Sequence, residues 1–143
     1  MDALENAREE ARRCGLELRR IDGGLALEGD GMTLLPDFRA ALPRLKQGRL
    51  QRELLVRAAK VKHPRNDPPL AFDATAGLGG DSLLLAAAGF RVRLFERNPV
   101  ISALLQDALA RAAADPQLAP IVARMEFAAG DSIAALADAE RDG

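Results

Sequence analysis

The spacing of apolar and polar residues changes near residue 70 and divides the chain into two predicted parts. In the first part, the segments 16–20, 25–28 and 32–35 alternate partly between apolar and polar residues and are separated by glycine-rich turns. Such alternation is typical of antiparallel strands, so we expect a small β-meander. Residues 1–13 have a helix-forming composition without a strong apolar stripe, which predicts a short exposed helix or a frayed arm.

Residues 45–62 form the last predicted element of this first part. Leu50, Leu54 and Val56 fall within a helical pattern whose other positions are largely basic, so we predict a helix. Residues 63–69 then contain three prolines, which lack a backbone donor and restrict the residue before them. We expect this stretch to end the helix and to link the two parts.

From residue 70 onward, apolar runs alternate with helical patterns. Strands are expected at 70–72, 91–95 and 125–128, and helices at 81–88, 98–113 and 131–139. Asn98 followed by Pro99 is a typical helix start, because asparagine caps the first turn and proline is tolerated there. The βαβαβ order predicts an α/β fold with a parallel, doubly wound sheet, of which only the first three strands are expected here.

Hydrophobic residues make up 48% and charged residues 29% of the chain, which excludes a disordered or fibrous protein. The longest strongly apolar stretch, 82–90, is shorter than the roughly 20 residues that cross a bilayer. The N-terminus lacks an export pattern, and the single cysteine, Cys14, cannot form an internal disulfide. We therefore expect a cytoplasmic protein without a membrane partner. Cys14 and His63 have no companion ligands at useful spacing, so no metal is expected either.

The net charge of −1 hides a strong asymmetry along the chain. Residues 39–65 hold nine of the 20 Lys and Arg residues and a single acid, Glu53. A solvated amphipathic helix would explain this basic run, and so would contact with RNA phosphates, which gives affinity without sequence information. Both interpretations stay open. The candidate RNA-binding residues are Arg44, Lys46, Arg49, Arg52, Arg57, Lys60 and Lys62.

The main chemical motif is the run 73–81, Asp-Ala-Thr-Ala-Gly-Leu-Gly-Gly-Asp, between the first strand of the α/β part and its helix. In an open α/β sheet the ligand crevice lies beyond the carboxyl ends of the strands. Gly77 and Gly79 would let the backbone turn tightly beside a ligand, and Gly80 would widen the opening. The helix beginning near Asp81 would supply free N–H groups. A purely structural turn is the alternative for the glycines, and a helix cap is the alternative for Asp81.

Acidic residues follow the tips of neighbouring strands. Glu96 ends the second strand, 19 residues after Gly77, where an acid can accept hydrogen bonds from both ribose hydroxyls of a nucleoside. Asp131 and Ser132 end the third strand, where a side chain can reach an adenine amino group, although both residue types also cap helices. The strand tips therefore predict a nucleoside-binding site.

Two residues favour S-adenosylmethionine over a dinucleotide cofactor. Asp73, at the end of the first strand, would repel a pyrophosphate but attract the cationic amino-acid end of S-adenosylmethionine, directly or through water. Ser82 occupies the position of the third glycine in a dinucleotide fingerprint, so the match to that pattern is incomplete. An NAD-dependent oxidoreductase domain stays open as the alternative.

The glycine loop, followed by Arg91-Val-Arg-Leu-Phe-Glu-Arg-Asn-Pro-Val100 and Ala103-Leu-Leu105, resembles the RsmJ family. These are bacterial small-subunit ribosomal RNA guanine-N2 methyltransferases. The match covers roughly residues 70–113, because the glycine loop, the Glu-Arg-Asn-Pro tetrad and their spacing occur together. The basic stretch 44–49 and the segment 54–59 are also similar to the family, though less specifically.

The resemblance implies a Rossmann-like methyltransferase core with a small N-terminal α+β extension. It implies S-adenosylmethionine as methyl donor and a guanine amine in 16S rRNA of the small ribosomal subunit as acceptor. Cofactor contacts are implied at Gly80 and Asp81, at Glu96 and Arg97, and at Asp131 and Ser132. The family commonly has arginine where this chain has Gly80, so only a backbone contact carries over there. Asp131 likewise replaces a small hydroxyl residue.

Amine methyltransferases of this kind resemble one another in an Asp-Pro motif after the fourth strand, which this chain lacks. Asp67-Pro68 precedes the first strand and lies at the wrong edge of the sheet. We therefore expect a chain truncated before its catalytic motif, with a 1–69 extension and a 70–143 half of the cofactor domain. Its catalytic residues and oligomeric state are unknown at this point, and a noncatalytic RNA-binding fragment is a third hypothesis.

Overall fold

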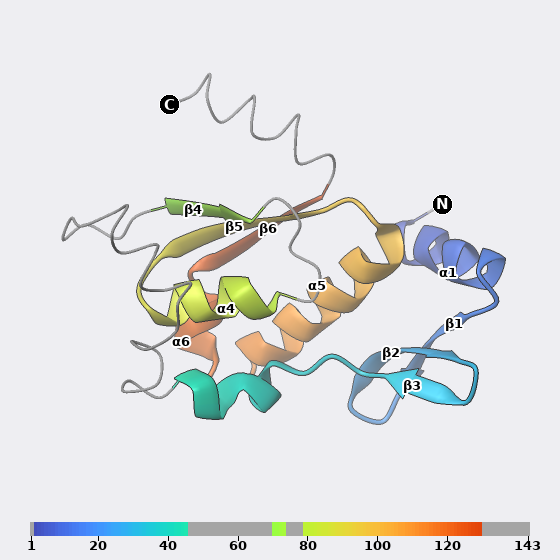
Figure 1. Ribbon diagram of the computed structural model, residues 1–143, viewed down its shortest axis with the longest axis horizontal. Helices are drawn as coiled ribbons and strands as arrows, with labels where there is room; N and C mark the ends of the chain where they lie inside the picture. The colour runs from blue at the N-terminus through green and yellow to red at the C-terminus, as the bar shows by residue number, and fades with distance from the viewer. Residues whose placement is uncertain (1, 46–69, 74–78, 130–143) are drawn as a thin grey trace, which may run out of the picture.

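The computed structural model describes residues 2–45, 70–73 and 79–129 (Figure 1). Its N-terminal part is a helix followed by an antiparallel sheet of order β1-β2-β3. The register pairs Leu18 with Leu27 and Leu27 with Leu34, which confirms the predicted meander. The elements of this part are α1 (Ala3–Arg13), β1 (Glu17–Ile21), β2 (Gly24–Gly29) and β3 (Met32–Leu34).

Helix α1 is half-buried rather than exposed. Ala7 and Ala11 are 0% and 1% exposed, and they belong to a cluster with Leu18, Leu25 and Leu104. The predicted short helix is confirmed, but the prediction that it is exposed or frayed is wrong. Two alanines four residues apart lie on one face of a helix and let a neighbouring helix approach closely, and a search for large apolar residues misses such a narrow stripe.

A 3-10 helix, η1 (Phe38–Leu45), follows the meander and includes Pro43. Phe38 is buried against the α/β part of the molecule. Leu45, where the sequence predicts a basic helix to begin, is the last residue of η1. The rest of that predicted helix and the proline-rich linker, residues 46–69, lie outside the described residues.

The second part contains a parallel sheet of order β4-β5-β6, as predicted. Its three strands and two longer helices occur where the sequence predicts them, with ends that differ by at most one residue. The short helix α6 is not predicted, because four residues that include Pro120 carry no recognisable period. The elements are β4 (Leu70–Asp73), α4 (Gly80–Ala87), β5 (Arg91–Glu96), α5 (Pro99–Ala113), α6 (Ala119–Val122) and β6 (Met125–Ala129).

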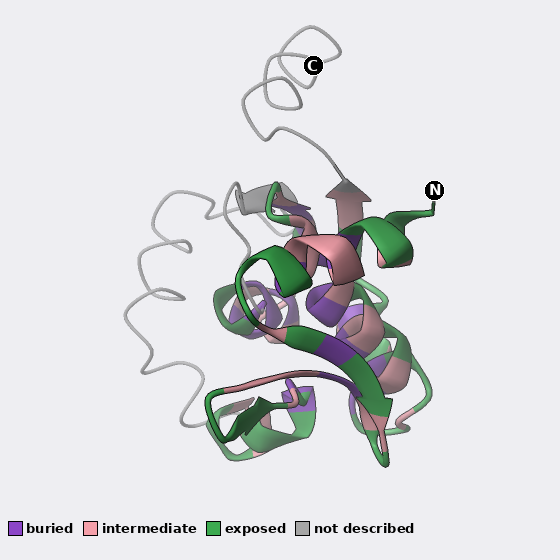
Figure 2. Ribbon diagram, turned by 90° about the vertical axis from the view of Figure 1, so that its right-hand side faces the viewer, coloured by how far each residue is buried: buried purple, intermediate pink, exposed green. Residues whose placement is uncertain are grey.

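Helix α6 contacts both α4 and α5, and all three helices lie on the same face of this sheet (Figure 1). Val92 and Leu94 are 1% and 0% exposed and join Leu83, Leu105 and Leu118 in the main core. Figure 2 shows buried segments, in purple, in the interior of the molecule. The alternation along β5 directs every second side chain toward the helices. Helices on the second face of the sheet, which a doubly wound fold requires, stay a prediction.

Helix α5 joins the two parts of the molecule. Leu104 packs into the cluster formed with α1 and the meander, whereas Leu105 packs into the core beneath the parallel sheet. Both side chains are 0% exposed. Neighbouring residues on this helix therefore bury their side chains in two different clusters.

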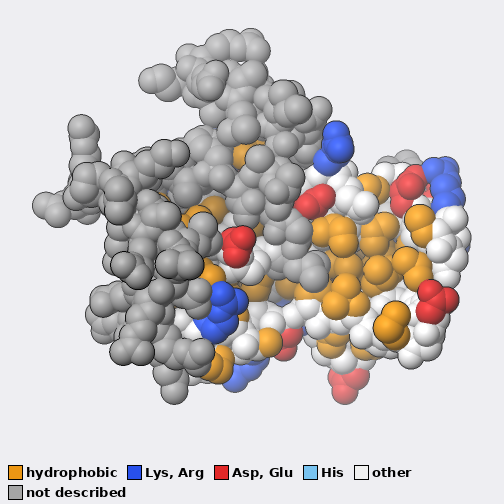
Figure 3. Space-filling model, in the orientation of Figure 1, with side chains coloured by type: hydrophobic (Ala, Val, Ile, Leu, Met, Phe, Trp, Pro, Cys, Tyr) orange, Lys and Arg blue, Asp and Glu red, His pale blue; other side chains and the backbone are white. Residues whose placement is uncertain are grey.

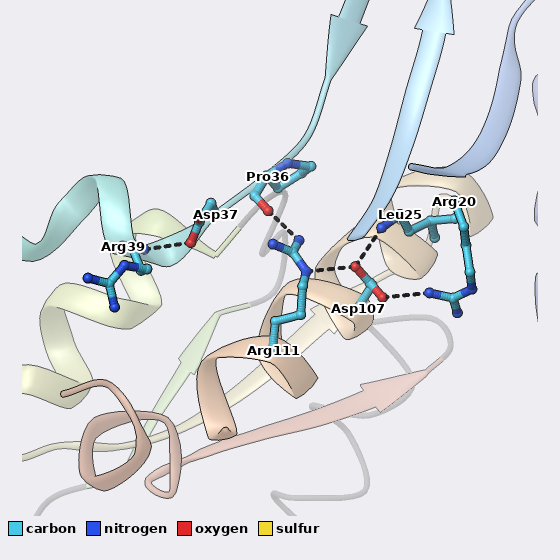
Figure 4. A network of polar contacts seen from close by, with 7 residues as sticks. All are labelled: Arg20, Leu25, Pro36, Asp37, Arg39, Asp107 and Arg111. Atoms are coloured by element: carbon cyan, nitrogen blue, oxygen red, sulfur yellow. Dashed lines mark hydrogen bonds and ion pairs between the residues drawn. The ribbon is translucent and has the colours of Figure 1, made fainter. Parts of the chain in front are cut away.

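A network of hydrogen bonds and ion pairs also connects the meander to α5 (Figure 4). The Asp107 carboxylate accepts hydrogen bonds of 2.9 Å from the Leu25 N–H, 2.9 Å from Arg111 Nε and 3.1 Å from Arg20. Arg111 also donates to the carbonyl oxygen of Pro36. Burial raises the pKa of Asp107, but the hydrogen bonds from Leu25, Arg111 and Arg20 outweigh it and hold the pKa below its ordinary value.

In the part of the chain that the structure describes, no helix is long and apolar enough to cross a membrane.

Candidate functional site

The carboxyl ends of the parallel strands meet at one edge of the sheet (Figure 1). Asp73, the last residue of β4, pairs with Leu94, and Glu96, the last residue of β5, pairs with Ala129 of β6. The backbone of Glu96 therefore lies two residues farther along the strands than that of Asp73. The fold brings these two predicted site residues to the same edge, at the ends of neighbouring strands.

Gly79 makes the turn from the loop into helix α4. Its φ of 84° is left-handed, and its carbonyl oxygen accepts the 2.9 Å hydrogen bond from the Leu83 N–H that opens the helix. A Cβ at this position would lie 2.9 Å from Leu105 Cδ1 and 3.0 Å from Phe38 Cζ. Both the backbone conformation and the close packing therefore require glycine here.

Gly80 and Asp81 begin helix α4 and are both exposed. A Cβ at Gly80 would meet no heavy atom within 4 Å, so open space lies beside the first turn. The first N–H groups of a helix have no partner within it and carry a partial positive charge, which suits a polar ligand. Asp81 is in the first turn, and the cap position belongs to Gly79, so the interpretation of Asp81 as a helix cap is wrong.

Glu96 is half-buried at the tip of β5, and the next turn holds its carboxylate. Its Oε2 accepts a 2.9 Å hydrogen bond from the N–H of Asn98. The side chain of Asn98 in turn caps α5, because its Oδ1 accepts hydrogen bonds of 2.9 Å from Val100 and 3.1 Å from Ile101. The predicted cap is confirmed, and the hydrogen bond to Glu96 is an addition that the sequence does not reveal.

The structure describes only part of the predicted site. Arg97 follows Glu96 with an exposed side chain, and Arg44 is exposed near the end of η1. The side chain of Asp73 and the remaining predicted residues lie outside the described part. Those remaining residues are Gly77, Asp131 and Ser132 of the cofactor site and Lys46, Arg49, Arg52, Arg57, Lys60 and Lys62 of the basic run.

A groove of about 490 Å³ starts at Glu96 and Arg97 and runs between α1 and α5. In Figure 3, apolar side chains gather on the surface that faces the viewer, in the region of these two helices. The lining includes Leu4 of α1, Leu25 of β2 and Ala103 of α5, residues from distant parts of the sequence. No local pattern could have revealed the groove, because it exists only once the N-terminal part packs on α5.

Phe38 is a second feature that the sequence analysis missed. The nearest atom of its ring lies 3.0 Å from where a Cβ on Gly79 would be, and the residue is 6% exposed. The isolated aromatic residue after Pro36 and Asp37 was a possible signal, because few phenylalanines occur in the chain. Its contact with a glycine some forty positions later depends on tertiary packing.

Within the described residues, no three His, Cys, Asp or Glu side chains cluster as a metal site would need.

A parallel α/β sheet, a glycine turn into a helix and an acid at the neighbouring strand tip define a nucleotide-binding α/β protein. The profile of the family described as "Putative SAM-dependent methyltransferase" matches residues 16–142. The chain therefore belongs to this family, and S-adenosylmethionine is the cofactor that defines it. This agrees with the predicted Rossmann-like fold and with the resemblance drawn from the glycine loop and the Glu-Arg-Asn-Pro tetrad.

Curated relatives bear the name ribosomal RNA small subunit methyltransferase J. The chain is 38% identical to the protein of Acinetobacter baumannii strain SDF over 121 residues, 85% of this chain and 42% of the relative. It is 44% identical to the Acinetobacter baylyi protein over 104 residues, 73% of this chain and 37% of that one. The chain thus spans less than half the length of these relatives.

A solved structure shares the fold. The crystal structure of the SAM-dependent methyltransferase NGO1261 from Neisseria gonorrhoeae has a TM-score of 0.57 and 32% sequence identity with this chain. The similarity covers 76% of this chain and 41% of the other.

The described residues fit the cofactor in chemistry and in space. Open space beside Gly80 leaves room for a ligand at the first turn of α4, the positive end of the helix dipole. The half-buried carboxylate of Glu96 offers hydrogen-bond acceptors, which the two hydroxyls of a ribose require.

Proposed function

We propose that this chain forms the cofactor-binding half of an S-adenosylmethionine-dependent methyltransferase that acts on 16S rRNA. The acceptor implied by the family resemblance is the exocyclic N2 of a guanine. One observation carries the proposal: Glu96 ends the parallel strand next to the one that leads, through Gly79 and Gly80, into helix α4. The relatives' name supports RNA as the substrate class.

In this proposal each strand tip has its own task. Glu96 would accept hydrogen bonds from the ribose hydroxyls, and Arg97 would provide a further cofactor contact. Asp73 would attract the cationic amino-acid end, directly or through water, and Gly77, Gly79, Gly80 and Asp81 would contact the cofactor at the glycine turn. Asp131 and Ser132 would bind the adenine amino group.

When bound, S-adenosylmethionine would supply an electrophilic methyl group: transfer to the guanine amine forms an N–C bond, breaks the S–C bond, and leaves S-adenosylhomocysteine and a proton. The main contribution of the protein to such a transfer is to hold the two reacting atoms in a near-attack geometry. We assign no catalytic residue to this chain. The residues that hold the target amine belong to the Asp-Pro motif that the resemblance implies for the longer relatives.

The basic run 39–65 is proposed as the RNA-docking surface, since its net charge of +8 suits a polyanion. Because phosphate contacts carry no sequence information, this run would dock RNA without choosing the base. An enzyme with this substrate works where ribosomes are assembled, so we place the protein in the cytoplasm.

Calorimetric titration tests the cofactor assignment. We expect the chain to bind S-adenosylhomocysteine and not NADH. Glu96→Ala should weaken this binding about tenfold or more, because hydrogen bonds to charged groups contribute about 1.5–3 kcal/mol. Arg91→Ala, at the exposed start of the same strand, is the matched control and should leave the affinity unchanged. Binding of NADH without S-adenosylhomocysteine would instead support the oxidoreductase domain.

A charge reversal tests the RNA surface. The variant Arg49→Glu, Arg52→Glu, Lys60→Glu should lose retention of a 16S rRNA fragment and show a smaller dependence of affinity on salt. Three exposed arginines of the N-terminal part, Arg12, Arg13 and Arg19, provide a control reversal with the same change in net charge. Equal affinity of both variants would reject the basic run as the contact surface.

A further inference from the structure

The carboxylate of Glu96 and the start of helix α5 are joined by one residue, Asn98. The Asn98 N–H donates to Glu96 Oε2 at 2.9 Å, and the Asn98 side chain caps the helix through Val100 and Ile101. The Asn98 carbonyl oxygen also accepts a 2.9 Å hydrogen bond from the Ser102 N–H. Backbone and side chain of Asn98 are therefore both fixed by α5.

The helix itself is firmly anchored. Leu104 and Leu105 are 0% exposed in two separate clusters, and Asp107 binds the meander through Leu25. A group held by the first turn of α5 thus takes its position from the core of the molecule rather than from a free loop. In addition, the N-terminus of a helix carries a partial positive charge, which attracts a carboxylate placed there.

We propose that Asn98 is a positioning residue for the cofactor: its backbone N–H holds one oxygen of Glu96, so that the carboxylate is oriented toward the ribose hydroxyls before the ligand binds. This inference rests on the proposed function of Glu96. Without the hydrogen bond, the Glu96 side chain would lose rotamer freedom when the ligand binds. This loss of side-chain entropy would weaken binding.

The backbone geometry of Asn98 allows a clean test. Its φ of −70° is the value of a proline, and its ψ of 120° is what the residue before Pro99 requires. Asn98→Ala removes the side-chain cap and keeps the N–H, whereas Asn98→Pro removes both. The difference between these two variants isolates the hydrogen bond to Glu96.

We expect Asn98→Pro to bind S-adenosylhomocysteine about fivefold more weakly than Asn98→Ala, because the Glu96 side chain must then lose its rotamer freedom on binding. In a Glu96→Ala background the same two variants should bind with equal affinity, because no carboxylate is left to position. The 2′,3′-dideoxy analogue of S-adenosylhomocysteine should also bind the two single variants equally. A merely structural effect of proline would lower the affinity in every one of these comparisons.

The outcomes separate this inference from the proposed function. If Glu96→Ala leaves the affinity for S-adenosylhomocysteine unchanged, the proposed cofactor site is wrong. If Glu96→Ala weakens binding but Asn98→Ala and Asn98→Pro bind alike, only the positioning role is wrong. Hydrogen exchange of the Asn98 amide gives a second test that does not need the proline variant to fold. The amide should exchange faster in Glu96→Ala than in the wild type, and equal rates would overturn the inference.

Discussion

Gly79 and Gly80 are neighbours in sequence, but their surroundings differ. Gly79 has a positive φ and is packed against Leu105 and Phe38, whereas Gly80 faces open space. Gly79→Ala should lower the free energy of unfolding by about 2 kcal/mol, because a left-handed backbone alone costs a non-glycine residue about 1–2 kcal/mol. We also expect it to weaken binding of S-adenosylhomocysteine, since the turn carries the proposed site. Urea unfolding and calorimetric titration measure the two effects.

Gly80→Ala is the matched control for this prediction. It places the same methyl group one residue later, in the first turn of α4, where alanine is favoured over glycine by up to about 1 kcal/mol. Stability should therefore stay constant or rise slightly. Equal destabilisation by both substitutions would mean that the difference in packing and φ between these glycines does not matter.

At the scale of single residues, sequence predicts what depends on short-range pattern. The glycine turn, Glu96 at a strand end and the Asn98 cap were all predictable, because each follows from spacing and local backbone chemistry. The contact of Phe38 with Gly79 and the hydrogen bond from Asn98 to Glu96 were not. They depend on how the chain packs and on which side-chain rotamer a glutamate selects.

At the scale of elements, Asp107 connects β2 to α5 and its carboxylate is largely enclosed, with 12% of the side chain exposed. Asp107→Asn puts an amide group where three donors converge, so one or more of them loses its acceptor. We expect the free energy of unfolding to fall by about 1–3 kcal/mol. Glu126→Gln is the control, since Glu126 is 68% exposed and 3.7 Å from Arg93, and it should cost less than about 0.5 kcal/mol. Equal losses in both variants would contradict the role of Asp107.

The same carboxylate predicts a pH dependence. Because the pKa of Asp107 is lowered in the folded state, that state binds fewer protons, and the stabilisation is fully present above the unfolded pKa of about 3.9. It is lost as the pH falls through the lower, folded pKa. The difference in stability between wild type and Asp107→Asn should therefore shrink below about pH 4. Asp115, whose pKa is also lowered, titrates in both proteins and cancels in the difference.

Helices and strands were predicted correctly where a periodic pattern extended over many residues or a specific cap residue marked the start. Helix α5 has fifteen residues, an asparagine cap and a proline in its first turn, and its start was predicted at the correct residue. Helix α6 has four residues and a leucine at the cap position that makes no side-chain cap hydrogen bond, so no local signal marks it. It forms because Val122 and the preceding Leu118 are buried under the sheet.

At the scale of the whole molecule, the N-terminal part (α1 and the meander) and the parallel sheet both pack against helix α5. Since Leu104 and Leu105 belong to two clusters on one helix, disruption of either cluster should loosen the other. We therefore expect urea unfolding, followed by circular dichroism, to show one transition rather than two. The sequence predicted both parts but not this dependence, because it predicted α1 to be exposed.

Ala7→Leu tests this coupling from the side farthest from the sheet. Ala7 of α1 is 0% exposed and belongs to the same cluster as Leu104 of α5. The three additional carbon atoms of leucine would push α1 away from α5, at a cost of about 1–3 kcal/mol in the free energy of unfolding. Ala3→Leu adds the same atoms at an exposed position of the same helix and should change stability by less than about 0.5 kcal/mol. If the two layers unfold as one unit, Ala7→Leu moves the whole transition to lower urea. A separate early transition, with the remainder at the wild-type midpoint, would show that the parallel sheet folds without its N-terminal layer.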